Sequence, residues 1–322
     1  MGTGFPHDGP TDAAAMAGRL GLQVPATLFI MKTLADIGED ALIARLVALA
    51  PAGEAGEGPG DDCAVMDEGG EMLRLLKTDA LVEGVHFLMD ADARAVGWKA
   101  VARVMSDFAA MGGVGERFLV TLALPGTMEI GWIEDFYRGM GDCLSRYGAR
   151  LAGGETCRVP EGSAAMISVA AMGSVARGKA VMRSGGRPGD GIWVTGRLGG
   201  SLAGKHLTFS PRVEEGRWIA ENLRPSAMMD LSDGLAKDLP RLAKSSGCGF
   251  RLERAAVPCM EGCDLAQALG DGEDFELLFT APADADVSGW GAMFPGLELT
   301  RIGELVPEGM GESLEGGWDH FG

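Results

Sequence analysis

The sequence predicts a mixed α+β chain of two domains, and three observations carry this prediction. Strand-like and helix-like segments alternate in both halves of the chain, which is typical of sheets packed against helices. A Gly- and Arg-rich segment at 177–190, with the turn Arg187-Pro188-Gly189-Asp190, separates the halves. The 322 residues, 46% of them hydrophobic, suffice for two cores. We therefore expect an N-terminal domain at 31–176 and a C-terminal α/β domain at 177–322.

Hydrophobic spacing predicts the elements of the N-terminal half in order. We expect a helix at 36–50, strands at 63–66 and 72–78, a helix at 97–111, a strand at 117–124, a helix at 129–147, and strands at 150–152 and 166–175. The short strand at 150–152 delivers Gly153, Gly154 and Glu155 at its end.

The C-terminal half restarts the alternation of strands and helices. We expect strands at 192–195, 250–252, 275–280 and 299–303, and helices at 214–223 and 235–245. A Gly-rich turn follows the first of these strands. No short-period internal repeat is present.

Composition excludes several classes of function. The net charge of −18 repels a nucleic-acid backbone, so we expect a small-molecule partner and no nucleic acid. No apolar run approaches the roughly 18 to 20 residues of a membrane span, so we expect no membrane association. Six cysteines in so long a chain predict reduced thiols and a cytoplasmic protein rather than a disulfide framework. Residues 1–30 lack a basic leader segment, and we expect an extension or a start placed too early, with order beginning near Met31.

Acidic residues beside Gly, Ser and Thr form the most informative pattern. They occur in the stretches 58–65, 77–79, 106–107, 153–156 and 229–234. Mg²⁺ in proteins is held by a few carboxylates together with phosphate oxygens. The pattern therefore predicts several Mg²⁺ ions gathered around a polyphosphate, which is phosphoryl-transfer chemistry.

A glycine-rich stretch at 199–206 nearly matches a P-loop. A P-loop needs Ser or Thr after its lysine to bind Mg²⁺ through the hydroxyl, whereas this chain has His206 after Lys205. We interpret the stretch as a glycine-rich turn into a helix and reject it as the main nucleotide site.

Several candidate residues also have an ordinary structural interpretation. Asp107 has the spacing of a helix-surface ion pair with Arg103, although its position near a glycine-rich helix end favours a site. Ser232 or a flanking aspartate is expected to cap the helix that follows, which leaves another carboxylate free. His86 fits either a loop histidine or a ligand contact.

Two further segments favour ligand binding. The glycines around Arg183 would let a phosphate approach, and a guanidinium binds phosphate oxygens bidentately. The stretch 270–274, which contains Glu273, is more acidic than a turn requires.

Together these clusters resemble one family closely, the thiamine-monophosphate kinases, whose superfamily includes aminoimidazole ribonucleotide synthetase and selenophosphate synthetase. The resemblance runs in order from about residue 37 to residue 321. It rests on the motifs at 60–64, 78–87, 98–100, 106–112, 183–184, 188–190, 230–235, 272–277 and 318–321.

The resemblance implies ATP-dependent phosphorylation of thiamine monophosphate to thiamine diphosphate by direct transfer, with several Mg²⁺ ions and no catalytic side chain. It also implies a homodimer whose N-terminal sheets form a barrel across the two-fold axis. By motif matching, the metal ligands would be Asp62, Thr78, Asp79, Asp107, Glu155, Asp230 and Asp233. ATP would contact Gly154, Glu155, Arg183 and Ser232, and thiamine monophosphate would contact His86, Glu273 and Trp318.

The chain departs from the family at Glu155, where the family usually has Asp, and the extra methylene displaces the carboxylate in a site that tolerates little misplacement. The alternatives are another ATP-using synthetase of the superfamily, of the aminoimidazole ribonucleotide or selenophosphate type, or a non-catalytic binder of thiamine phosphate or nucleotide. The motifs at 82–87 and 318–321 are not expected in those synthetases, and Glu155 leaves the binder open.

Overall fold

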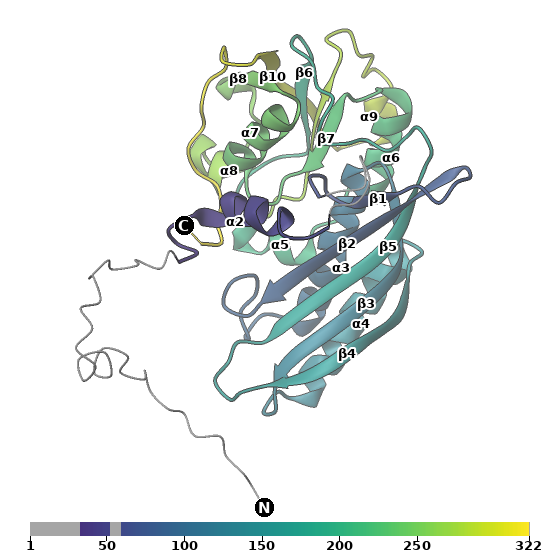
Figure 1. Ribbon diagram of the computed structural model, residues 1–322, viewed down its shortest axis with the longest axis vertical. Coiled ribbons are helices and arrows are strands. Elements are labelled where there is room, and N and C mark those ends of the chain that lie inside the picture. The colour runs from purple at the N-terminus through teal and green to yellow at the C-terminus, as the bar shows by residue number, and fades with distance from the viewer. Residues whose placement is uncertain (1–32, 52–58, 322) are drawn as a thin grey trace, which may run out of the picture.

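The computed structural model describes residues 33–51 and 59–321, which form two five-stranded sheets with helices (Figure 1). The extension expected at residues 1–30 lies outside these ranges. The first sheet lies before, and the second after, the expected boundary segment at 177–190. None of the helices in the described ranges is long and apolar enough to cross a membrane. All six cysteines are unpaired, as expected for reduced thiols.

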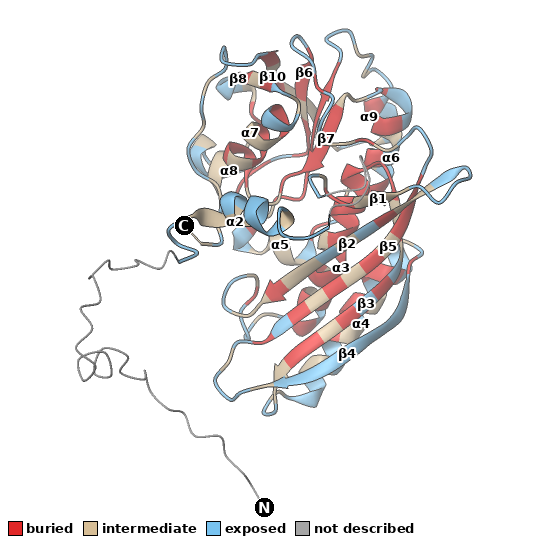
Figure 2. Cartoon of the chain, in the orientation of Figure 1, coloured by how far each residue is buried: buried red, intermediate tan, exposed pale blue. Residues whose placement is uncertain are grey.

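The N-terminal sheet has the strand order β1-β2-β5-β3-β4, and only the β3–β4 pair is parallel. The strands are β1 (Ala64–Met66), β2 (Met72–Val82), β3 (Val114–Pro125), β4 (Arg150–Val159) and β5 (Met166–Ala176). In β5, Ile167, Val169 and Ala171 are buried at alternate positions, so one face of the sheet joins the core. Edge strand β4 is exposed along nearly its whole length (Figure 2).

Helices α3 (Ala93–Ala110) and α4 (Ile130–Arg146) pack together on one face of this sheet, and Figure 1 shows no described helix on the other face. The two helices approach closely because they meet at glycines. A Cβ atom on Gly97 would lie 1.9 Å from the Phe136 carbonyl oxygen, and one on Gly139 would lie 1.8 Å from that of Arg94. Close packing here fixes α3, which carries Asp107, against the sheet.

The C-terminal sheet has the order β7-β9-β6-β10-β8, with every pair antiparallel. Its strands are β6 (Gly191–Thr195), β7 (Ala227–Asp230), β8 (Cys248–Leu252), β9 (Leu277–Ala281) and β10 (Leu299–Pro307). The helices around it are α5 (Lys205–Thr208), α6 (Val213–Asn222), α7 (Leu235–Ser245), α8 (Leu265–Gly270) and α9 (Trp290–Met293), with short 3-10 turns η1 (Ser201–Ala203) and η2 (Arg254–Ala256). Strands β6, β7 and β9 are almost entirely buried, which explains their continuous apolar runs.

The structure differs from the sequence expectation in several places. Helix α3 begins at Ala93 rather than 97, because the Asp92 side chain accepts a hydrogen bond from the Arg94 amide and caps the helix. Strand β4 is ten residues long rather than three, because it pairs with β3 through the glycines to Val159. Helices α8 and α9 were not expected.

Helix α2 (Gly38–Val47) was expected in the N-terminal domain, but it pairs with the C-terminal half. The Glu39 carboxylate lies 3.2 Å from the Lys237 ammonium, and that of Asp40 lies 3.1 Å from the Arg241 guanidinium, both on α7. The domain limits at 31–176 and 177–322 stay a prediction, with α2 as the segment whose contacts cross them.

Candidate active site

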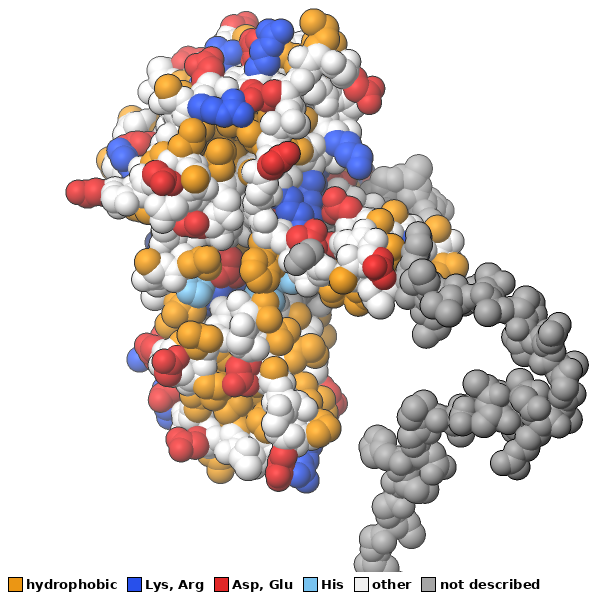
Figure 3. Space-filling model, turned by 90° about the vertical axis from the view of Figure 1, so that its left-hand side faces the viewer, with side chains coloured by type: hydrophobic (Ala, Val, Ile, Leu, Met, Phe, Trp, Pro, Cys, Tyr) orange, Lys and Arg blue, Asp and Glu red, His pale blue; other side chains and the backbone are white. Residues whose placement is uncertain are grey.

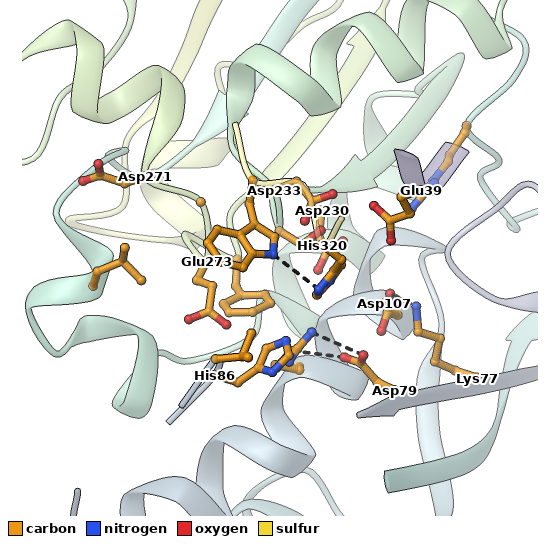
Figure 4. Close-up of a pocket in the computed structure, with 18 residues that line it drawn as sticks. Glu39, Lys77, Asp79, His86, Asp107, Asp230, Asp233, Asp271, Glu273 and His320 are labelled. Atoms are coloured by element: carbon orange, nitrogen blue, oxygen red, sulfur yellow. Dashed lines mark hydrogen bonds and ion pairs between the residues drawn. The ribbon is translucent and has the colours of Figure 1, made fainter. Parts of the chain in front are cut away.

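A cavity of about 250 Å³ is lined by residues from both halves of the chain (Figure 4). Strand β2 and helix α3 contribute one wall, and the segments after β7 and α8 contribute the other. The C-terminal tail adds Trp318 and His320, and α2 adds Glu39. Figure 3 shows histidine side chains at the surface between the upper and lower parts of the molecule. Of the residues expected to bind ligands, Asp79, His86, Asp107, Arg183, Asp230, Ser232, Asp233, Glu273 and Trp318 line this cavity.

Three buried carboxylates lie together beside the cavity. Oxygen atoms of Asp62, Asp107 and Asp230 all lie within 4.8 Å of one another, and the residues are 2%, 6% and 3% exposed. Asp62 precedes β1, Asp107 stands on α3 and Asp230 ends β7, so three distant segments converge. Burial raises the pKa of Asp230 to about 6 and that of Asp107 well above its usual range. These directions show that the ionised cluster needs cations around it.

The cluster has partners for some of its oxygens. The Lys77 ammonium lies 2.6 Å from Asp107 Oδ1, and the Arg183 guanidinium lies 2.5 Å from Asp62 Oδ1. The Ser106 hydroxyl donates to Asp230 at 2.6 Å. Asp62 Oδ2 is buried without a hydrogen-bond partner among the described residues. A buried oxygen left unpaired beside two other carboxylates fits a hard, oxygen-seeking cation such as Mg²⁺.

The ion pair between Asp107 and Arg103, considered from the helical spacing, is not formed. Arg103 instead lies 3.0 Å from the carboxylate of Asp79, donates to the carbonyl of Ala80, and stands over the ring of Phe275 at 5.9 Å. Asp107 faces β2 and pairs with Lys77. Arg103 is therefore a cavity residue that sequence reasoning missed, since its contact lies on another element.

Capping of α7 also differs from the expectation. No side chain of the 230–233 turn caps the helix, whose N-cap is Gly234. The carboxylate of Asp238, inside the first turns, accepts hydrogen bonds from the amides of Ser232 and Asp233 at 3.1 and 3.0 Å. Burial, together with the charge of Asp233, raises the pKa of Asp238 to about 8. Asp233 itself pairs with Arg241 at 2.5 Å.

Lys99 joins two residues expected to bind the substrate. Its ammonium is fully buried and lies 2.7 Å from Glu273 Oε2, 2.6 Å from the His86 carbonyl oxygen and 2.7 Å from His206 Nδ1. His206 Nδ1 also lies 2.9 Å from Glu273 Oε2. Although burial alone would raise it, these partners hold the pKa of Glu273 at about 2. A lysine on the apolar face of an expected helix is the signal that would have found this network.

The backbone around Glu273 is strained. Glu273 and Phe275 have φ angles of 53° and 51°, a region that residues other than glycine adopt at a cost. Phe275 is held in this conformation by stacking on Phe209, with the two ring centroids 4.1 Å apart. Strain of this kind persists only where the surrounding structure fixes it, and here it presents the Glu273 carboxylate to the cavity.

His86 and the tail face one another across the cavity. The Val82 amide donates to His86 Nδ1 at 3.0 Å, so Nε2 carries the ring proton, and burial lowers the pKa of His86 to about 4. The rings of His86 and His320 lie 5.7 Å apart. Trp318 Nε1 lies 3.4 Å from His320 Nδ1 (Figure 4). The Trp318 amide donates to the Asp233 carbonyl oxygen at 2.9 Å. These contacts place a half-exposed indole at the cavity edge.

The glycine-rich stretch at 199–206 uses its amides internally. The Gly199 amide donates to the Asp274 carboxylate at 3.0 Å, and the Gly200 amide donates to that of Asp271 at 2.8 Å. A P-loop needs such amides free for phosphate oxygens. The arrangement supports rejecting this stretch as a nucleotide site.

Three expected ligand positions lie away from the cavity. Thr78 is exposed and lines a second cavity of about 590 Å³ on the sheet face, because successive side chains of β2 point to opposite sides. Gly154 and Glu155 lie on exposed edge strand β4, where Glu155 accepts a hydrogen bond from the Thr156 amide. Within one chain, these residues are not brought to the carboxylate cluster.

The chain is similar to known proteins along most of its length. The family model for AIR synthase related protein matches residues 60–175 with its N-terminal domain and residues 187–314 with its C-terminal domain. Thiamine-monophosphate kinase of Escherichia coli K12 is 37% identical over 254 residues, covering 70% of this chain and 76% of that protein. The Salmonella typhimurium enzyme is 34% identical over 309 residues, covering 82% and 91%.

A solved structure is similar to this chain in fold as well as in sequence. The structure described as AaThiL complexed with AMPPCP and TMP superposes with a TM-score of 0.79 and 31% identity, covering 91% of this chain and all of that one. A match over 91% of this chain includes residues of both halves.

Proposed function

The chain belongs to the thiamine-monophosphate kinase family of AIR synthase related proteins, and we propose how its cavity carries out that family's reaction. The protein is a kinase that phosphorylates thiamine monophosphate to thiamine diphosphate with ATP. The observation that carries the mechanism is the buried cluster of Asp62, Asp107 and Asp230 beside a cavity that also contains His86 and Glu273.

Mg²⁺ fits the donor set of this cluster. Asp62, Asp107 and Asp230 would hold it, with Asp79 and Asp233 at the same cavity as further expected ligands. When bound, Mg²⁺ would neutralise charge on the polyphosphate and help fix its orientation. The buried, unpartnered Oδ2 of Asp62 supports this assignment.

Arg183 and Ser232 would form the ATP side of the site. The Arg183 guanidinium is fixed by Asp62, yet its buried Nε has no hydrogen-bond partner among the described residues. Ser232 is held in place because its amide donates to Asp238. We expect Arg183 to bind phosphate oxygens, since the amides of the glycine-rich stretch already have carboxylate partners.

His86, Glu273 and Trp318 would form the thiamine monophosphate side. The indole of Trp318 suits the positively charged thiazolium ring, because an aromatic face attracts a cation. His86 presents the Nε2 proton as a donor, and Glu273 presents an ionised acceptor on its strained backbone. The two residues keep a fixed separation because Lys99 binds both.

The chemistry is a direct transfer that requires positioning rather than a catalytic side chain. A phosphate oxygen of thiamine monophosphate forms a bond to the γ-phosphorus of ATP, while the bond to the bridging oxygen breaks and ADP leaves. The transferring group needs alignment and charge stabilisation. Arg183 and Arg103, both at the cavity, supply fixed positive charge.

A homodimer would complete the site. The helix-free face of the N-terminal sheet bears the apolar cavity lined by Leu76, Leu119 and Met172, and β4 offers a long exposed edge. A second copy covering this face would form a barrel of two sheets, since an open apolar face is typical of an interface. Thr78 lies on that face, so we expect Thr78, Gly154 and Glu155 to contribute to nucleotide and metal binding only in the dimer. We also propose a cytoplasmic location, in keeping with six unpaired cysteines.

Turnover with matched acceptors tests the function. Purified protein with ATP and Mg²⁺ should convert thiamine monophosphate to thiamine diphosphate with one ADP formed per product. Thiamine, which lacks the acceptor phosphate, should give no product under the same conditions. ATP hydrolysis without thiamine diphosphate, or equal use of thiamine, would contradict the assignment.

A further inference from the structure

The carboxylate cluster already contains a positive charge supplied by β2. Lys77 lies two residues before Asp79 on the same side of the strand, and both line the cavity. Its ammonium lies 2.6 Å from Asp107 Oδ1, whereas Arg183 pairs with Asp62 and, within the described part of the chain, the Asp230 carboxylate accepts its side-chain hydrogen bond from the Ser106 hydroxyl. The side chain is 22% exposed, so it is largely enclosed with the carboxylates.

An ammonium in this position competes with a divalent ion. The contact occupies Asp107 Oδ1, and a metal ion on that oxygen would lie next to a positive charge with little water between them. Lys77 and Arg183 together neutralise two of the three carboxylate charges, so the cluster retains one net negative charge. Several Mg²⁺ ions would need more negative charge than this to balance them. Asp62 Oδ2 has no hydrogen-bond partner among the described residues, and Asp230 accepts from a hydroxyl rather than from a cation, so oxygens of these carboxylates are left for an ion.

We propose that Lys77 takes the place of one divalent cation in the cluster, so that this chain binds one Mg²⁺ fewer there than it would with a neutral residue 77. The proposal rests on the proposed metal site. It assigns Lys77 a positioning role, since its ammonium holds the Asp107 carboxylate in place while the remaining oxygens bind metal. It also implies that a divalent ion can replace the ammonium when the lysine is removed.

Mn²⁺ binding measures this directly, without reference to turnover. Mn²⁺ alone is titrated into the full-length wild type, Lys77→Gln, Lys77→Arg and Lys179→Gln, with free Mn²⁺ followed by electron paramagnetic resonance. Lys77→Gln removes the charge, Lys77→Arg keeps it, and Lys179→Gln removes a charge from an exposed lysine as the matched control. Each protein is also melted in chelator and in Mn²⁺.

Lys77→Gln should bind one additional Mn²⁺ per chain, or bind its first Mn²⁺ about tenfold more tightly, because a neighbouring positive charge is gone. Its melting temperature should be lower than that of wild type in chelator and recover in Mn²⁺. Lys77→Arg and Lys179→Gln should match wild type in number and affinity.

Unchanged Mn²⁺ binding by Lys77→Gln overturns the proposal, including the case in which the same variant binds AMPPCP more weakly, which would make Lys77 a nucleotide contact. Failure of Lys77→Gln to recover in Mn²⁺ also overturns it, because the ion then does not replace the ammonium. If the wild type binds no Mn²⁺ at all, the metal site of the proposed function fails together with this inference. A further outcome is that the wild type binds Mn²⁺ and forms thiamine diphosphate while Lys77→Gln binds no additional Mn²⁺ and binds it no more tightly. In that case the metal site and the proposed function stand, and the inference about Lys77 alone is wrong.

Discussion

The buried ammonium of Lys99 lies 2.7 Å from the carboxylate of Glu273, and this contact joins helix α3 of the N-terminal half to the strained segment before β9. The same ammonium binds the His86 carbonyl oxygen. One lysine therefore sets the distance between two residues proposed to hold the substrate.

Replacing Lys99 by Met should remove the ammonium from the Glu273 carboxylate and leave it with His206 as its partner. Loss of one member of a buried ion pair typically destabilises a protein by about 3–5 kcal/mol, so we expect a fall of this order in the free energy of unfolding. The KM for thiamine monophosphate should rise as well. Urea denaturation and steady-state kinetics measure both effects.

Lys244→Met removes the same charge from an exposed position at the end of α7 and serves as the control. It should change stability by no more than about 0.5 kcal/mol. Equal effects of the two variants would show that the Lys99 contacts contribute nothing specific.

The pH dependence of stability should contain a contribution from His86. Burial lowers the pKa of His86 from 6.5 to about 4, so the unfolded chain binds the proton more tightly. Stability from this group is complete above pH about 6.5 and is lost as the pH falls towards 4, by roughly 3 kcal/mol in all. His86→Gln should flatten the stability profile in this window, as measured by urea denaturation at each pH. A profile parallel to that of wild type would mean that His86 titrates normally.

Much of this organisation follows from sequence patterns, because those patterns are local. The acidic stretches containing Asp62, Asp79, Asp107 and Asp230 predict a cation site, and the structure brings their segments to one place. The ion-pair partner of Asp107 could not be predicted in this way. Helical spacing favours Arg103, whereas the observed partner, Lys77, lies on a strand. Partner choice between distant elements depends on tertiary packing and leaves no local signal.

Two further differences have the same origin. The glycines after residue 152 indicate the end of a strand, yet β4 continues because pairing with β3 supplies its hydrogen bonds. The amides of Ser232 and Asp233 donate to the carboxylate of Asp238 rather than to a side chain of the 230–233 turn. Asp238 lies in the first turns of the helix that follows, and its side chain points back toward the turn. Thr78, Gly154 and Glu155 lie away from the cavity within one chain, and their roles, which the proposed dimer would complete, stay a prediction.

Nucleotide affinity should separate Arg183 from the near-P-loop lysine. Arg183→Ala should weaken AMPPCP binding about tenfold or more, because charge-assisted hydrogen bonds to phosphate are lost. Lys205→Ala should change it little, since the Lys205 ammonium contacts the Arg197 carbonyl oxygen and lies 3.5 Å from Glu276. Calorimetric titration with AMPPCP and Mg²⁺ measures both. The reverse order of effects would favour a P-loop.

The oligomeric state should depend on the open sheet face. Leu119→Arg places a charge on this face and should convert the proposed dimer to a monomer, because a buried unpaired charge opposes association. Ile130→Arg, at a more exposed apolar residue on α4, is the matched control and should leave the dimer intact. Light scattering after size-exclusion chromatography gives the mass. A monomeric wild type, or equal behaviour of both variants, would exclude the proposed barrel.

Asp230→Asn tests the central claim most directly, because Asp230 is the member of the cluster that forms no ion pair with the basic side chains of residues 33–51 and 59–321, so its neutralisation breaks none of these pairs. Formation of thiamine diphosphate from ATP and thiamine monophosphate is measured at saturating Mg²⁺, together with the melting temperature in chelator. We predict that turnover falls about 100-fold or more, because charge stabilisation of the transferred group is lost, while the melting temperature in chelator is unchanged or higher. Turnover equal to that of wild type would contradict the assignment of the three buried carboxylates as the centre of the reaction.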